Sequence, residues 1–171
     1  MDVLELSYKH LSDYMKPCFL YFGAFLEVRE ILTWKLISLW IAEGFLQKAE
    51  YRSLEEVAEA YMKDLINRSL VMVAKKGSLS GVKTCSIHDL LLEFCVAKAK
   101  EEYFLQVLHG PEELFTFNEP GNFNRLCIHS KVKDFQMSRL FCPRISCLLF
   151  FAHPRCAIFL SFFEFANFLE C

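Results

Sequence analysis

The sequence lacks an excess of charge of either sign. Its 19 Lys and Arg residues nearly balance 21 Asp and Glu residues, which leaves a formal net charge of −2. Proteins that bind nucleic acid through general electrostatic attraction carry a clear basic excess. We therefore expect no nucleic acid among the partners of this chain.

Paired metal-binding motifs are also missing, because none of the eight Cys residues lies in a CxxC pair. Cys142, Cys147 and Cys156 are loosely clustered, but no His-rich motif accompanies them, so buried reduced thiols are favoured over a zinc site. The residues after Met1 are acidic and lack the apolar segment of a signal peptide. We therefore expect a reducing compartment and a cytoplasmic location, with peripheral attachment to membranes left open.

No uninterrupted apolar run is long enough to cross a membrane. The most apolar stretch, residues 145–169, is interrupted by His153, Pro154, Arg155 and Glu164, whereas a spanning helix needs about 20 predominantly apolar residues. What the sequence does contain is core material, with 54% hydrophobic residues and 18 Phe. We find neither a nucleophile–base pair nor a metal triad, and we predict that the chain is not an enzyme.

Apolar residues at helical spacing predict three helices in the first part of the chain, over residues 3–11, 14–25 and 30–42. The third is apolar nearly all round, which is typical of a core helix. Gly44 is expected to end it, because glycine readily adopts the left-handed conformation that follows a helix.

A fourth helix and a hairpin follow. Residues 53–56 read Ser-Leu-Glu-Glu, a capping box that predicts a helix reaching about Arg68. Strand-like residues 70–74 and 82–87 flank a turn-rich loop and predict a β-hairpin. The predicted fold class is mainly α with a small β-hairpin, the outline of a winged helix. Its DNA-binding form needs a recognition helix rich in polar and basic side chains, and we disfavour that alternative because the third helix carries one lone cation, Lys35.

The stretch from Cys85 to Cys95 joins a short strand directly to a helix that continues to about Glu102. Asp89 stands where a helix N-cap is expected, and His88 lies just outside it. Such a junction aims one side chain and the positive end of a helix at a common point, which suits an anionic phosphate. The alternative is that Asp89 is only a cap and His88 an ordinary surface residue.

The second part of the chain predicts short strands at residues 103–108, 126–129 and 145–150. The last two lie about twenty residues apart, as in leucine-rich repeats. The predicted organisation is a winged-helix domain over 1–108, a linker over 109–124 and an incomplete leucine-rich-repeat start over 125–171.

Several short motifs in register resemble one family. The chain resembles plant nucleotide-binding leucine-rich-repeat disease-resistance proteins, in particular late blight resistance protein homologues with an N-terminal coiled coil. The resemblance is firmest over residues 3–108, and its motifs are Leu6–Leu11, Cys18–Phe22, Leu39–Phe45, Tyr61–Leu70 and Ile87-His88-Asp89.

The resemblance implies a regulatory role in an intracellular immune receptor, which couples the ADP or ATP state to defence signalling and the hypersensitive response. Ile87-His88-Asp89 matches the family's Met-His-Asp motif, with Ile87 in place of Met. This match implies that His88 contacts the β-phosphate of bound ADP and that Asp89 holds the turn that positions His88. The implied partners are the nucleotide-binding, coiled-coil and repeat domains of the receptor and, indirectly, a pathogen effector or host target.

The chain departs from the family pattern in three ways. It has neither a phosphate loop ending in Gly-Lys-Thr or Gly-Lys-Ser nor the acidic strand that holds Mg²⁺. Ser12-Asp13 also stands where the family often has Leu-Pro. We therefore expect a truncated chain that binds neither ADP nor ATP by itself. The alternatives left open are a protein-interaction adaptor without a nucleotide role and, less favoured, a DNA-binding winged helix.

Overall fold

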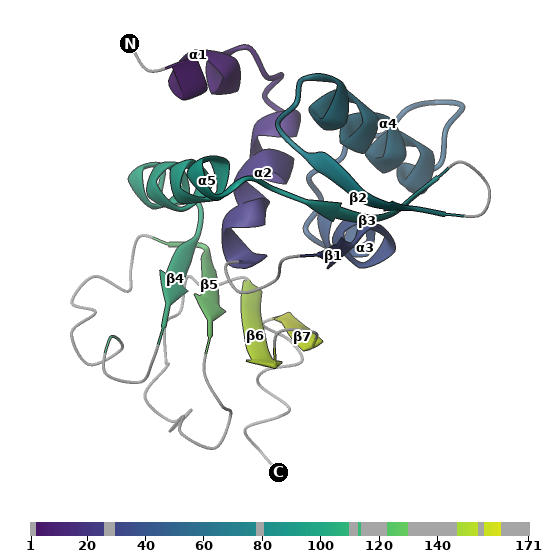
Figure 1. Ribbon diagram of the computed structural model, residues 1–171. Coiled ribbons are helices and arrows are strands. Elements are labelled where there is room, and N and C mark those ends of the chain that lie inside the picture. Colours follow the sequence, from purple (N-terminus) through teal and green to yellow (C-terminus); the bar gives the residue numbers. More distant parts are fainter. Residues whose placement is uncertain are drawn as a thin grey trace. The chain divides into compact units, whose positions relative to one another are not determined.

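The computed structural model describes residues 3–25, 30–77, 81–109, 113, 123–129, 147–153 and 156–161. The chain divides into two compact units, residues 1–95 and 96–171, which are described separately below (Figure 1). The division falls within the last long helix rather than after residue 108.

The first unit contains most of the helices. They are α1 (Val3–Lys9), α2 (Met15–Leu20), the 3-10 helix η1 (Tyr21–Phe25), α3 (Thr33–Ala42), α4 (Leu54–Asn67) and α5 (Asp89–Glu101), which continues into the second unit. The predicted capping box is confirmed: the Glu56 N–H donates to Ser53 Oγ at 3.2 Å, and the Ser53 N–H donates to Glu56 Oε2 at 2.8 Å. Gly44 follows Glu43, the C-cap of α3, and has φ +70, as predicted for a helix end.

The third predicted helix begins too early. Ile31 and Leu32 form strand β1 (Ile31–Leu32), which pairs antiparallel with Cys85 and Thr84. Ile31 is buried and Leu32 exposed, so these two residues follow the alternation of a strand rather than a helical spacing. A short apolar run fits either structure, and here the sheet offers a partner for the backbone.

The predicted hairpin is confirmed, with its first strand at residues 72–76 instead of 70–74, and it belongs to a three-stranded sheet. Strands β2 (Met72–Lys76) and β3 (Val82–Ser86) pair antiparallel, and the strand order is β1-β3-β2. The Lys75 Nζ reaches Glu30 Oε2 at 2.7 Å, and the Thr84 hydroxyl donates to the same carboxylate oxygen at 3.4 Å. These contacts tie the hairpin to the segment that enters β1.

Aromatic side chains fill the core of the first unit. Trp40 is fully buried and meets Phe22 edge to face with ring centroids 6.3 Å apart, and Tyr21 meets Phe45 in the same way at 5.4 Å. The prediction that the third helix is buried nearly all round is wrong, because Trp34 on α3 is 61% exposed.

The second unit contains a four-stranded sheet of β4 (Gln106–Leu108), β5 (Arg125–Ile128), β6 (Cys147–His153) and β7 (Cys156–Ser161). The first three strands are parallel, and β7 returns antiparallel to β6. The three predicted strands are confirmed with shifted ends, whereas β7 was not predicted. Most of the predicted linker, residues 109–124, lies outside the described residues. No helix among the described residues is long and apolar enough to cross a membrane.

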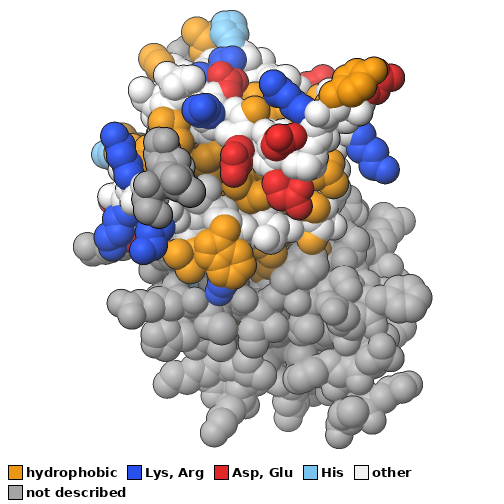
Figure 2. Space-filling view, turned by 90° about the vertical axis from the view of Figure 1, so that its right-hand side faces the viewer, with side chains coloured by type: hydrophobic (Ala, Val, Ile, Leu, Met, Phe, Trp, Pro, Cys, Tyr) orange, Lys and Arg blue, Asp and Glu red, His pale blue; other side chains and the backbone are white. Residues whose placement is uncertain are grey.

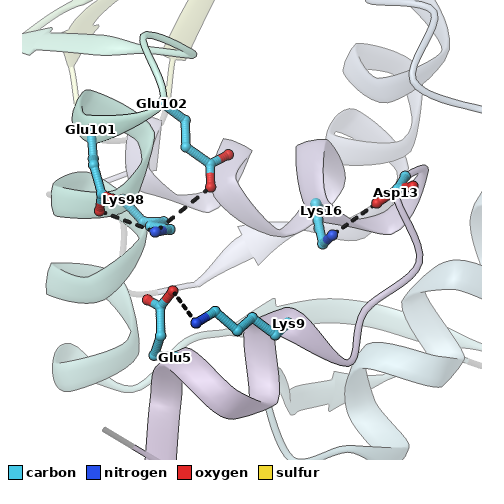
Figure 3. A network of polar contacts seen from close by, with 7 residues as sticks. All are labelled: Glu5, Lys9, Asp13, Lys16, Lys98, Glu101 and Glu102. Atoms are coloured by element: carbon cyan, nitrogen blue, oxygen red, sulfur yellow. Dashed lines mark hydrogen bonds and ion pairs between the residues drawn. The ribbon is translucent and has the colours of Figure 1, made fainter. Parts of the chain in front are cut away.

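Surface ion pairs in Figure 3 connect neighbouring turns of the same segment. Lys98 Nζ lies 3.1 Å from Glu101 Oε2 and 3.8 Å from Glu102 Oε1 at the end of α5. The Glu5–Lys9 pair in α1 and the Asp13–Lys16 pair at the start of α2 have the same local character. Each pair has at least one solvent-exposed partner, and local pairs of this kind add little to stability, so the fold depends on its apolar core.

The described cysteine side chains are buried free thiols, as predicted. Burial raises the pKa of Cys18 to about 12 and that of Cys85 to about 11, and it raises the pKa of Cys95 well above its usual value. Few thiolates then exist at neutral pH, and the thiolate is the reactive form. We expect these three thiols to resist alkylation in the folded chain and to react once urea unfolds it, as mass spectrometry of the labelled peptides can establish. Rapid labelling of Cys95 without denaturant would contradict the packing described.

Candidate functional site

The candidate site is the junction between β3 and α5. The Leu92 N–H donates to the His88 carbonyl at 2.9 Å, which is the first hydrogen bond of the helix. The Leu90 N–H donates to His88 Nδ1 at 3.3 Å. A residue whose carbonyl and side chain both accept from the first helical turn is the N-cap, so His88 caps α5.

The prediction that Asp89 provides this cap is therefore wrong by one residue. Asp89 is the first helical residue, it is exposed, and within the described part of the chain its carboxylate accepts no capping hydrogen bond. Its negative charge still lies in the first turn, where it interacts favourably with the helix dipole. Ile87, which precedes the cap, is half-buried.

The cap determines what the imidazole of His88 can offer to a ligand. A nitrogen that accepts a hydrogen bond carries no proton, and a neutral imidazole has one N–H, so the proton lies on Nε2. His88 is exposed. The junction therefore presents an N–H donor and the positive end of a 13-residue helix, a combination that attracts an anion.

Ring contacts fix the start of α5 within the first unit. Phe94 meets Tyr8 of α1 edge to face at 5.7 Å and Phe19 of α2 at 6.4 Å between ring centroids. The Cys95 thiol donates to the Phe19 carbonyl at 3.4 Å. Leu90, in the first turn of α5, is 61% exposed. The N-terminal end of α5, which carries His88, is thus held in place by Phe94 and Cys95 in the following turns and not by Leu90.

The site also contains a feature that sequence reasoning missed, namely the capping role of His88. Asp, Asn, Ser and Thr are the usual N-caps, so a His-Asp pair directs attention to Asp89. Which of the two neighbours points its acceptor back at the helix depends on side-chain geometry, which the local sequence pattern does not specify.

The surface of α4 bears on the alternative of DNA binding. In a helix-turn-helix pair the second helix enters the major groove, and here that helix is α4 rather than the third predicted helix. Its exposed side chains include Glu55, Glu56 and Glu59, and Asp64 forms an ion pair with Arg68 at 2.9 Å. Figure 2 shows acidic side chains gathered in the middle of the coloured surface, with Lys and Arg side chains dispersed around them. The acidic side chains of α4 would repel phosphates, which disfavours DNA binding.

Metal binding finds no support in the part of the chain that the structure describes. No group of three or more His, Cys, Asp or Glu side chains is arranged there to hold an ion. Cys147 is buried, Cys142 lies outside the described residues, and the side chain of Cys156 is likewise not described.

The order α2–β1–α3–α4–β2–β3, with strand order β1-β3-β2, defines a winged-helix domain. Residues 25–95 match the family model of the disease resistance protein winged helix domain. The late blight resistance protein homologs R1B-23 and R1B-11 of Solanum demissum are 52% and 51% identical to the chain over 104 residues. That alignment covers 60% of this chain and 8% of each relative. The chain is thus related to plant disease-resistance proteins, and it contains their winged-helix domain.

Proposed function

We propose that the chain is the switch segment of an intracellular plant immune receptor, in which the winged helix couples the ADP or ATP state to defence signalling and the hypersensitive response. The observation that carries this proposal is the exposed His88 at the start of α5, with Nδ1 engaged in the cap and the ring proton on Nε2. The relationship to disease-resistance proteins supports the same reading.

In the proposed closed state, His88 Nε2–H donates to the β-phosphate of ADP. Asp89 contributes through its interaction with the helix dipole, which steadies the turn, and Ile87 anchors the segment between strand and helix. A hydrogen bond to a charged group contributes about 1.5–3 kcal/mol. The contact would be absent from the open state, so it favours closure.

The rest of the nucleotide grip would lie in other parts of the receptor. The chain spans 8% of the length of the relatives it matches, and it contains no Gly-Lys-Thr or Gly-Lys-Ser loop. Hydrolysis is assigned to those other parts, and the chain itself is proposed to have no enzymatic activity. Its proposed partners are the nucleotide-binding, coiled-coil and repeat domains, with the pathogen effector or host target acting indirectly.

The second unit is proposed to be the start of the leucine-rich repeats. Strands β4, β5 and β6 are parallel and begin about twenty residues apart, which is the spacing of such repeats. The antiparallel β7 departs from that pattern.

A second candidate function is a protein-interaction adaptor without a nucleotide role. It is favoured by the exposed Trp34 on α3, since tryptophan is enriched at protein interfaces. The two candidates differ in whether His88 matters to the receptor: an adaptor acting through α3 would tolerate its replacement.

The isolated chain is expected to bind ADP weakly or not at all. One imidazole and one helix end supply only a few kcal/mol, with about 0.3–1 kcal/mol from the helix end, whereas millimolar affinity already needs about 4 kcal/mol. Isothermal calorimetry should show no saturable heat at micromolar ADP. Micromolar binding by this chain would mean that it holds a nucleotide site of its own. The proposal that most of the nucleotide site lies in other parts of the receptor would then be wrong.

A further inference from the structure

We propose that His88 serves two partners at once, so that the cap of α5 and the nucleotide contact strengthen each other. Nδ1 holds the first turn of the helix by accepting from the Leu90 N–H, and Nε2–H is directed to the anion. This inference rests on the proposed function, but it adds a coupling between ligand and helix that the phosphate contact alone does not require.

The coupling follows from the chemistry of the imidazole ring. Accepting at Nδ1 keeps the proton on Nε2, where the anion needs it. When Nε2–H donates to an anion, electron density shifts toward Nδ1 and makes it a better acceptor, just as linked hydrogen bonds polarise one another in a chain. A ring held at both nitrogens also loses its rotational freedom only once, so each contact is easier to form when the other exists.

Because of the position of the cap, this coupling affects the order of the first turn of α5. The next turns of α5 are anchored by Phe94, against Tyr8 and Phe19, and by the buried Cys95. The first turn extends beyond this anchored part and depends on His88. Ligand binding should therefore order the first turn of α5, and by reciprocity a weakened cap should weaken ligand binding.

The cap itself is tested in this chain by amide hydrogen exchange at Leu90. His88→Ala removes the acceptor, and the Leu90 amide should exchange about tenfold faster, the typical effect of losing an N-cap. His88→Asn should keep most of the protection, because Asn is a good capping residue. Equal exchange in the native chain and His88→Ala would show that Nδ1 does not cap the helix and would overturn the proposal.

The coupling is tested in a full-length receptor that carries residues 3–108. Leu90→Pro removes the N–H that Nδ1 accepts, and Leu90→Ala is the matched control, because it keeps this N–H and trims an exposed side chain. The chain already tolerates a proline in the first turn of a helix, at Pro17 in α2. Circular dichroism checks that both variants fold.

Leu90→Pro should weaken ADP binding about threefold to tenfold relative to Leu90→Ala, as expected when a lost cap is coupled to the ligand. If Leu90→Pro and Leu90→Ala bind ADP equally while His88→Ala binds it more weakly, the phosphate contact is supported and the proposed coupling is wrong. If His88→Ala leaves ADP affinity unchanged, the proposed function and the coupling both fail, and the amide exchange still reports whether His88 caps the helix.

Discussion

Replacing Phe19 with alanine should lower the free energy of unfolding by about 3–5 kcal/mol, the usual cost of removing a buried aromatic ring. Phe19 is 1% exposed and contacts the rings of Tyr8 and Phe94. The substitution leaves a cavity at the point where α1, α2 and α5 meet. Since small domains are stable by about 5–15 kcal/mol, much of the folded population should be lost on mild heating.

Urea unfolding of the chain, followed by circular dichroism, measures this effect. Tyr51→Ala is the control, because it removes an aromatic ring that is almost fully exposed and should change stability little. Similar losses in the two variants would mean that the three-ring cluster does not hold the first unit together. The cluster would then also fail to explain how the start of α5 is positioned.

His88→Ala should activate a full-length receptor that carries this segment, without a pathogen. The substitution removes both the cap and the proposed hydrogen bond to the β-phosphate, about 1.5–3 kcal/mol for the latter alone. The hydrogen bond to the β-phosphate is proposed to exist only in the closed state, so its loss falls on that state. A difference of this size shifts the closed-to-open ratio about tenfold or more, enough to populate a minor open state. The measurement is cell death in leaves that express equal amounts of native and variant receptor.

Asp89→Val provides the comparison that the corrected cap position makes informative. Because Asp89 interacts with the helix dipole and does not cap the helix, its loss should weaken the start of α5 by about 0.3–1 kcal/mol and should affect the closed state less than the loss of His88. Cell death should therefore rank His88→Ala above Asp89→Val. A stronger effect of Asp89→Val, at equal protein levels, would restore Asp89 as the residue that holds the turn. Silence of both variants would favour the adaptor.

Local signals with their own chemistry were predictable from the sequence. The Ser53–Glu56 capping box, the end of α3 at Gly44 and the β2–β3 hairpin each depend on residues a few positions apart, and the structure confirms all three. The outline of a winged helix was predictable from the order of these helices and strands along the chain. The placement of a His at a strand–helix junction was also predictable, because both flanking elements were clear.

What escaped prediction depends on contacts between distant segments or on the rotamer of one side chain. Ile31 and Leu32 are apolar enough for a helix, and only pairing with Cys85 and Thr84, more than fifty residues later, makes them a strand. His88 caps α5 in place of the predicted Asp89, and this depends on the orientation of one imidazole nitrogen. Composition and spacing carry no information on either point.

Calorimetric ADP and ATP titrations of the full-length receptor measure whether His88 binds the nucleotide of the closed state. Leu90→Ala is the control for changes at the same helix end. We predict that His88→Ala weakens ADP binding about tenfold to a hundredfold, the equivalent of a charged hydrogen bond, and weakens ATP binding less. Equal ADP affinities of the native receptor and His88→Ala would contradict the account.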